Sequence, residues 1–307
     1  MKSFKKIIWT LTLVIVMTPF HLYAQAGSGG KTGLSFLKFG VGGQASAMGE
    51  AFTAVVDDAY STFWNPAGLA GLQQSQLVFT HTEWLQDISN EFFAFAFPAF
   101  GGGVGVSVYT NNVNGIQRRT TSSVEPIGSV DANDVAFSIS YGRNVAENIQ
   151  AGVTVKYLYE KIFTESSSGY AVDLGVKYHV KNSPLQVGFV VQNLGSMSEF
   201  AQESVDLPKT FRGGVQYQMA LENFGSSLIF AIDGVKTVDT DFHTNFGAEL
   251  LLKQKIFLRV GYQTGFDQKS VGGGLGLTFH RYQLDYGYTP FDSNFGEIHR
   301  FSFALNL

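Results

Sequence analysis

Residues 149–160 read IQAGVTVKYLYE, and this stretch decides the fold. An apolar row begins at Ile149, recurs at every second position and ends at Tyr159. The positions between carry polar or small side chains, with Leu158 as the one exception. Because successive side chains of a strand point to opposite faces, the stretch predicts a β-strand with one apolar and one wet face.

The same alternation recurs along the chain and predicts about fourteen strands, most near the 9–11 residues that a tilted strand needs to cross a bilayer. Since no helices are expected to cover so many two-faced strands, the favoured arrangement is a closed cylinder with its apolar face in lipid. The predicted fold class is therefore all-β, a transmembrane antiparallel β-barrel with an even number of strands. The expected strands are 75–83, 91–99, 103–110, 134–143, 149–160, 169–180, 184–194, 209–219, 226–236, 241–253, 255–264, 269–279, 281–290 and 297–306.

The composition supports a membrane protein. Charged residues make up 15% of the chain, against roughly 25% in an ordinary soluble domain. The chain has no cysteine, which excludes disulfide and thiol chemistry. No basic tract lies beyond the first residues, so nucleic acid is not an expected partner.

The first residues have the order of a secretory signal. Lysines within residues 1–6 precede the apolar run 7–17, and small residues follow at Ala24 and Ala26. The apolar run is short of the roughly 20 residues that a spanning helix needs. We expect residues 1–24 to be a signal peptide; the alternative is an uncleaved anchor helix.

Eight ionisable side chains fall on the polar rows of the expected strands, so they are predicted to face the lumen. A charge at the bilayer midplane would cost roughly 2–4 kcal/mol, which excludes the lipid face for them. They form either a structural lumen network or, in the alternative, a substrate-binding or gating cluster. The eight are Asp173, Lys177, Arg212, His243, Glu249, Arg259, Asp285 and Arg300.

Residues 25–74 break the alternation and are rich in Gly and Ala. Asn65 can cap a short helix over 66–71, with Pro66 at its first position. A segment this apolar is not expected to lie free in the periplasm. We therefore predict that it packs as a hatch inside the barrel formed by residues 75–307; the alternative is a soluble linker. The expected alternation of short and long connections would leave both termini in the periplasm.

Two runs in this segment resemble the N-terminal signature of the PorV/PorQ family, part of the wider FadL-like group of outer-membrane barrels. They are GQASAMGEAFTAVVDDA at 43–59 and WNPAGL at 64–69. The resemblance implies a fourteen-stranded barrel whose hatch carries an Asn-Pro-Ala turn. The hatch or gate residues that follow from it are Asn65, Pro66, Ala67, Trp64 and Phe52.

The function that the resemblance implies divides in two. PorV-type relatives belong to the type IX secretion system of Bacteroidota-like bacteria, where they escort or attach exported proteins. We expect such a component in the Gram-negative outer membrane, with the translocon, its cargo and outer-membrane lipid as partners. The alternative is a FadL-like channel for a hydrophobic small molecule. Two features depart from the family: the external loops are short for a cargo-binding member, and the chain ends at Leu307 instead of an aromatic residue.

We expect no enzymatic activity, no bound metal and no cofactor. The histidines are scattered, without the spacing of metal ligands. His81, with Glu83 and Asp87, is the one set that could serve a barrel enzyme, near the first external loop. The alternative interpretation of that set is a solvated loop.

Overall fold

The computed structural model describes residues 32–84, 88–119, 125–200, 205–221, 225–265, 271–291 and 296–307. The expected signal peptide lies outside these residues. Four short helical segments precede the strands: η1 (Ser35–Lys38), α2 (Gly43–Ala47), α3 (Ser61–Trp64) and η2 (Pro66–Gly71). None of these has the length and hydropathy that would let a helix cross a bilayer.

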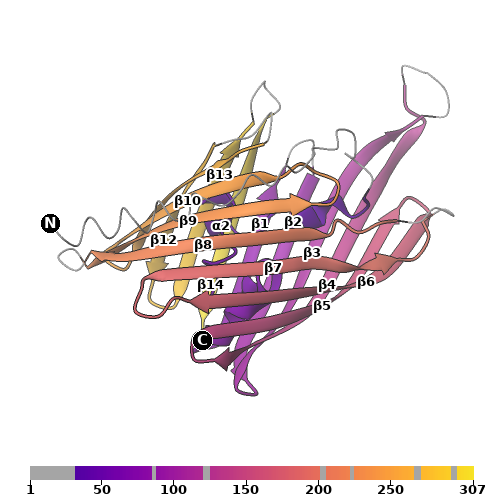
Figure 1. Ribbon diagram of the computed structural model, residues 1–307. Helices are drawn as coiled ribbons and strands as arrows, with labels where there is room; N and C mark the ends of the chain where they lie inside the picture. Colours follow the sequence, from indigo (N-terminus) through magenta and orange to yellow (C-terminus); the bar gives the residue numbers. More distant parts are fainter. Residues whose placement is uncertain are drawn as a thin grey trace.

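The strands of the described residues form one closed barrel (Figure 1). Each strand pairs antiparallel with its neighbours in the sequence, and β1 closes on β14. The predicted fold class is therefore confirmed. The strands are β1 (Gln76–Glu83), β2 (Ile88–Ala99), β3 (Gly102–Arg118), β4 (Gly128–Ala146), β5 (Ile149–Ile162), β6 (Glu165–His179), β7 (Leu185–Met197), β8 (Thr210–Leu221), β9 (Ser226–Thr237), β10 (His243–Leu252), β11 (Ile256–Gln263), β12 (Val271–Phe279), β13 (Tyr282–Pro290) and β14 (Glu297–Asn306).

Strand β5 shows why the chain forms a barrel. Its apolar row faces outward, and the Val155 side chain is half exposed. Its polar row faces the lumen, where Thr154 and Lys156 are buried. Leu158, the exception in the pattern, also faces inward and is buried within the core. Apolar side chains outside and polar ones inside are the reverse of a soluble barrel and match a surface in lipid.

The barrel has two distinct ends, which we name by their connections. The inner end carries tight turns, such as Phe100–Gly101 between β2 and β3, and the last residue, Leu307. The outer end carries the β1–β2, β3–β4, β5–β6, β7–β8, β9–β10, β11–β12 and β13–β14 connections. This division follows the expected alternation of tight periplasmic turns and longer external loops, with one exception. A longer connection was expected at 161–168, but β5 and β6 continue into it and are joined by residues 163–164 alone.

The largest departure from the expected strands lies at the outer end. Residues 111–133 were expected to be a loop, but β3 and β4 continue through most of them and project beyond the neighbouring strands (Figure 1). A register shift between Val113 and Ile116 marks the start of the projecting part. Both faces of this ribbon are exposed beyond the shift, so it carries no apolar alternation from which a strand could be recognised.

The described start of the chain reaches the outer end. Thr32 forms a β-bridge with Asp206 in the β7–β8 connection, and Lys38 forms an ion pair with Asp239 in the β9–β10 connection, at 2.9 Å. The segment then runs through the lumen toward the inner end, where Gln73 precedes β1. The described start of the hatch therefore lies opposite Leu307. The N-terminus, which was expected in the periplasm together with the C-terminus, lies outside the described residues.

A charge placed in the outward row of β4 should test the lipid face. We expect Ile139→Arg to destabilise the barrel by roughly 2–4 kcal/mol, because Ile139 is an exposed side chain near the middle of the strand. Ile116→Arg is the matched control, since Ile116 is also exposed but lies on the projecting ribbon. Folding into vesicles, followed by heat-modifiable gel mobility, measures the difference. Equal folding of both variants would contradict the assignment of the lipid face.

Candidate functional site: the lumen and its hatch

Residues 32–72, which we call the hatch, lie inside the barrel and contact its wall all around (Figure 1). Helix α2 packs against β11–β14, and η2 packs against β3–β6. The hatch is in close contact with the wall because inward rows carry glycine at the contact points. A Cβ atom added to Gly261 would lie 1.9 Å from the Gly49 nitrogen, and one added to Gly152 would lie 2.3 Å from the Pro66 carbonyl carbon. Such glycines allow close backbone approach.

Polar side chains of the wall hold the backbone of the hatch. The Asp233 carboxylate on β9 accepts hydrogen bonds from the amides of Phe52 and Thr53, at 3.0 and 2.9 Å. The Lys177 ammonium on β6 donates to the Val56 carbonyl at 2.6 Å. Because these side chains are buried, they satisfy hatch backbone groups that water cannot reach.

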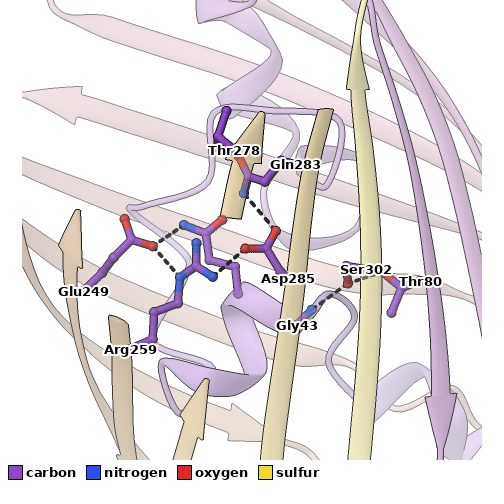
Figure 2. Close-up of polar contacts among 9 residues, drawn as sticks. Gly43, Thr80, Glu249, Arg259, Thr278, Gln283, Asp285 and Ser302 are labelled. Carbon is purple, nitrogen blue, oxygen red and sulfur yellow. Dashed lines mark hydrogen bonds and ion pairs between the residues drawn. The ribbon is translucent and has the colours of Figure 1, made fainter. Parts of the chain in front are cut away.

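Three of the eight predicted lumen charges form one cluster (Figure 2). Arg259 on β11 donates through Nε to Glu249 Oε2 at 2.6 Å and through Nη1 to Asp285 Oδ1 at 2.5 Å. The Gln44 amide of the hatch donates to Glu249 at 2.8 Å, and Gln283 donates to Asp285 at the same distance. The cluster thus joins β10, β11 and β13 to α2.

The other predicted charges have separate partners. Asp173 pairs with Lys156 at 2.7 Å. Arg212 lies over the ring of Trp64, with its Cζ atom 4.9 Å from the ring centroid. Arg300 Nη1 donates to Ser46 Oγ at 2.5 Å. Residue His243 is half-buried at the outer end of β10, apart from these contacts.

The predicted hatch residues meet at one point of the lumen, and all are buried. Asn65 donates to the Thr53 carbonyl at 3.0 Å and accepts from the Ala67 amide at 3.2 Å, so it caps η2 with Pro66 at the first position. The expected short helix at 66–71 is therefore present, in 3₁₀ form. The Trp64 indole donates to the Val41 carbonyl at 3.0 Å, and its ring meets Phe52 edge to face.

Aromatic side chains form two groups of ring contacts in the lumen, and the Tyr109 hydroxyl joins them by donating to the Phe39 carbonyl at 3.3 Å. At the outer end, the half-buried ring of Phe39 stacks on Trp84 with centroids 4.4 Å apart, and Phe291 meets Trp84 edge-on. Deeper in the lumen, the rings of Tyr109 and Phe36 are in contact, with centroids 5.0 Å apart. We call the whole set the aromatic column; it consists of Phe36, Phe39, Tyr60, Phe63, Trp64, Trp84, Phe92, Tyr109 and Phe291.

The sequence interpretation missed the aromatic column and several partners of the lumen charges. Phe92 and Tyr109 sit on inward rows, where an aromatic residue appears only as an exception to the alternation. Asp233 lies on the inward row of β9, so its row position was a usable signal. Glu50 Oε1 lies 3.9 Å from Arg300 Nη2. Glu50 belongs to the hatch, whose sequence does not alternate and so does not indicate which way its side chains point.

The residues weighed for an enzyme do not form a lumenal site. His81 and Glu83 lie on the outward row of β1, and His81 Nδ1 is 2.6 Å from Glu91 Oε1 of β2. Asp87 lies outside the described residues. Across the described chain, no group of three His, Cys, Asp or Glu is arranged to hold a metal ion.

The outward apolar rows, the closed barrel and the enclosed hatch define an outer-membrane β-barrel. Solved structures share this fold. CymD, a monoaromatic hydrocarbon channel, is similar with a TM-score of 0.64 and 12% identity, over 87% of this chain and 98% of that chain. The toluene transporter TbuX of Ralstonia pickettii gives 0.60 and 12%, over the same shares. A FadL homologue of Pseudomonas aeruginosa gives 0.56 and 8%, over 87% and 98%.

The sequence comparisons match part of the chain. The model of the uncharacterised protein family UPF0164 matches residues 23–144, which contain the hatch and the strands from β1 into β4. A UPF0164 protein of Treponema pallidum (strain Nichols) is 28% identical over 182 residues, or 52% of this chain. That match covers 42% of the relative, so the chain spans less than half of that protein's length. Neither comparison names the PorV/PorQ family, which stays a resemblance of two runs.

Proposed function

We propose that the chain is a non-enzymatic outer-membrane channel that takes up small hydrophobic, preferably aromatic, molecules. The observation that carries this proposal is the aromatic column, which has half-buried rings at the outer end and buried rings deeper in the lumen, two of them, Phe63 and Trp64, on the hatch. Aromatic side chains bind planar apolar ligands by stacking and edge-to-face contacts. The structural neighbours, which include a toluene transporter and a monoaromatic hydrocarbon channel, support this choice of ligand.

The hatch is the gate in this proposal. A ligand that enters along the column meets Phe63 and Trp64, which also contact each other edge to face. Helix α3 carries both rings and is a single turn between Tyr60 and Asn65. A displacement of this turn would move both rings without unpairing any strand.

Two adjacent phenylalanines of β2 allow a matched test. Phe92 is buried in the column, whereas Phe93 faces lipid and is 40% exposed. We expect Phe92→Leu to lower the initial uptake of labelled toluene into proteoliposomes about three- to tenfold, since aromatic pairs contribute beyond their area. Phe93→Leu should leave uptake unchanged. Equal uptake by both variants, with normal heat-modifiable mobility, would refute the column as the ligand path.

A type IX secretion component is the second candidate. Two observations favour it: the resemblance of 43–59 and 64–69 to the PorV/PorQ signature, and a hatch whose backbone is in close contact with the wall. In this case the protein acts in a Bacteroidota-like outer membrane, with the translocon and its cargo as partners. Co-purification of a large translocon with the native barrel would favour this candidate. Normal secretion by a deletion strain, together with lost toluene uptake, would exclude it.

A further inference from the structure

Two apolar grooves lie on the outward wall near the inner end, away from the hatch and the aromatic column. The first, of about 590 Å³, runs along β8–β11 beside Leu250 and Leu252. The second, of about 440 Å³, runs along β11–β14 beside Leu275, Leu277 and Leu284. Ile256, the first residue of β11, lines both grooves. The two grooves therefore diverge from one point at the inner rim.

A basic turn stands at that point. Lys253 and Lys255 lie in the β10–β11 turn, line the first groove and have exposed side chains. In the part of the chain that the structure describes, neither ammonium lies within 4 Å of a carboxylate. A lysine at this depth can lay its methylene stem along apolar surface and present its charge at the membrane boundary.

The backbone of this turn is strained. The Lys255 amide donates to the Leu252 carbonyl at 3.0 Å, and Lys253 and Gln254 both have left-handed φ angles, of 51° and 57°. Such a type I′ turn normally carries Asn-Gly, since a Cβ atom disfavours positive φ. This chain has Lys-Gln at these two positions. The turn thus places an ammonium group at the rim and carries backbone strain.

The next turn adds further positive charge. The Thr278 amide donates to the Lys255 carbonyl at 2.8 Å, so the end of β12 lies directly beside the basic turn. The β12–β13 turn then carries His280 and Arg281, both exposed. The inner rim over the two grooves thus presents three permanent positive charges and one titratable imidazole.

We propose that this part of the wall binds an anionic phospholipid with two acyl chains, from the leaflet at the inner end. Lys253 and Lys255 hold the phosphate, and Arg281 lies on the adjacent turn. The acyl chains lie in the two grooves, one on each side of Ile256. Basic side chains at a membrane boundary attract anionic headgroups, and the paired apolar grooves select a ligand with two chains. The site does not depend on what passes through the lumen.

The test uses the full-length protein in detergent with equimolar phosphatidylglycerol and phosphatidylcholine, and native mass spectrometry to measure the lipid retained. Lys253→Asn/Lys255→Gln removes both charges and keeps the turn, because Asn accepts a positive φ readily. We expect retention of phosphatidylglycerol to fall at least about tenfold, with retention of phosphatidylcholine unchanged. Heat-modifiable mobility verifies that the barrel is folded.

The control Lys161→Gln/Lys181→Gln removes two exposed charges from the outer part of β5 and from the β6–β7 turn. It should retain phosphatidylglycerol as the wild type does. An equal loss in both double variants, or no loss in the first, would overturn the proposal. Retention of glycerol phosphate, which has no chains, as strongly as phosphatidylglycerol would also overturn it, since the grooves would then play no part.

Discussion

Replacement of Arg259 by methionine should lower the free energy of unfolding by about 3–5 kcal/mol, the usual cost of removing one partner from a buried ion pair. Arg259 is 5% exposed and is the shared partner of Glu249 and Asp285. Its loss leaves two carboxylates close together in a site that water reaches poorly. Urea unfolding of the barrel in vesicles, followed by tryptophan fluorescence, measures the change.

Two further variants distinguish the ion pairs from packing. Arg143→Met removes an exposed arginine from the inner end of β4 and should change stability little. Adding Glu249→Gln and Asp285→Asn to Arg259→Met removes the unpaired charges and should recover most of the loss. If the triple variant were as unstable as Arg259→Met, the cost would come from lost packing, and the electrostatic account would be wrong.

A side chain at Gly261 should displace the hatch without opening the barrel. In Gly261→Val the new Cβ atom would overlap the Gly49 nitrogen and the Met48 carbonyl carbon, 1.9 and 2.2 Å away. Backbone atoms of a closed turn cannot rotate aside, and overpacking of this kind typically costs 1–3 kcal/mol or more. Because the strand pairs of β11 do not involve this side chain, we expect the barrel to fold and the hatch to leave its place.

Planar-bilayer conductance and limited proteolysis measure the displacement. The Gly261→Val protein should conduct ions more than the wild type and should be cleaved within residues 43–71. Gly273→Val is the matched control, since it faces outward on β12 and its added Cβ atom would have only the Arg259 carbonyl oxygen near, at 3.7 Å. Wild-type conductance of the Gly261→Val protein would show that the hatch tolerates the insertion and does not close the lumen.

Alternation predicted the barrel well where lipid covers the wall. The strand expected at 297–306 has the observed bounds, and β5 extends only from Glu160 to Ile162 beyond its expected range. Residues 111–133 were predicted as a loop because the projecting ribbon lies beyond the lipid. Both of its faces are exposed there, so its sequence does not alternate between apolar and polar residues. The alternation within a single strand is thus enough to predict which of its side chains face lipid and which face the lumen.

The candidate site was less predictable because its contacts are not local. Glu249 and Asp285 could be placed on inward rows, but their shared contact with Arg259 depends on the register between strands. The aromatic column depends on the path of the hatch, since Phe36, Tyr60 and Phe63 come from a segment without alternation. The Asn-Pro-Ala turn was predictable because a cap and a proline act within a few residues.

The enclosed hatch also restricts the order in which the protein can be assembled. It touches opposite sides of the wall, from Thr80 on β1 through Asp233 on β9 to Ser302 on β14. A cylinder that had already closed would have to admit some forty residues through an end. We therefore expect the hatch to be in place before β1 pairs with β14, so that the sheet closes around it. A chain that lacks the hatch should insert into the membrane slowly, even though it keeps every strand.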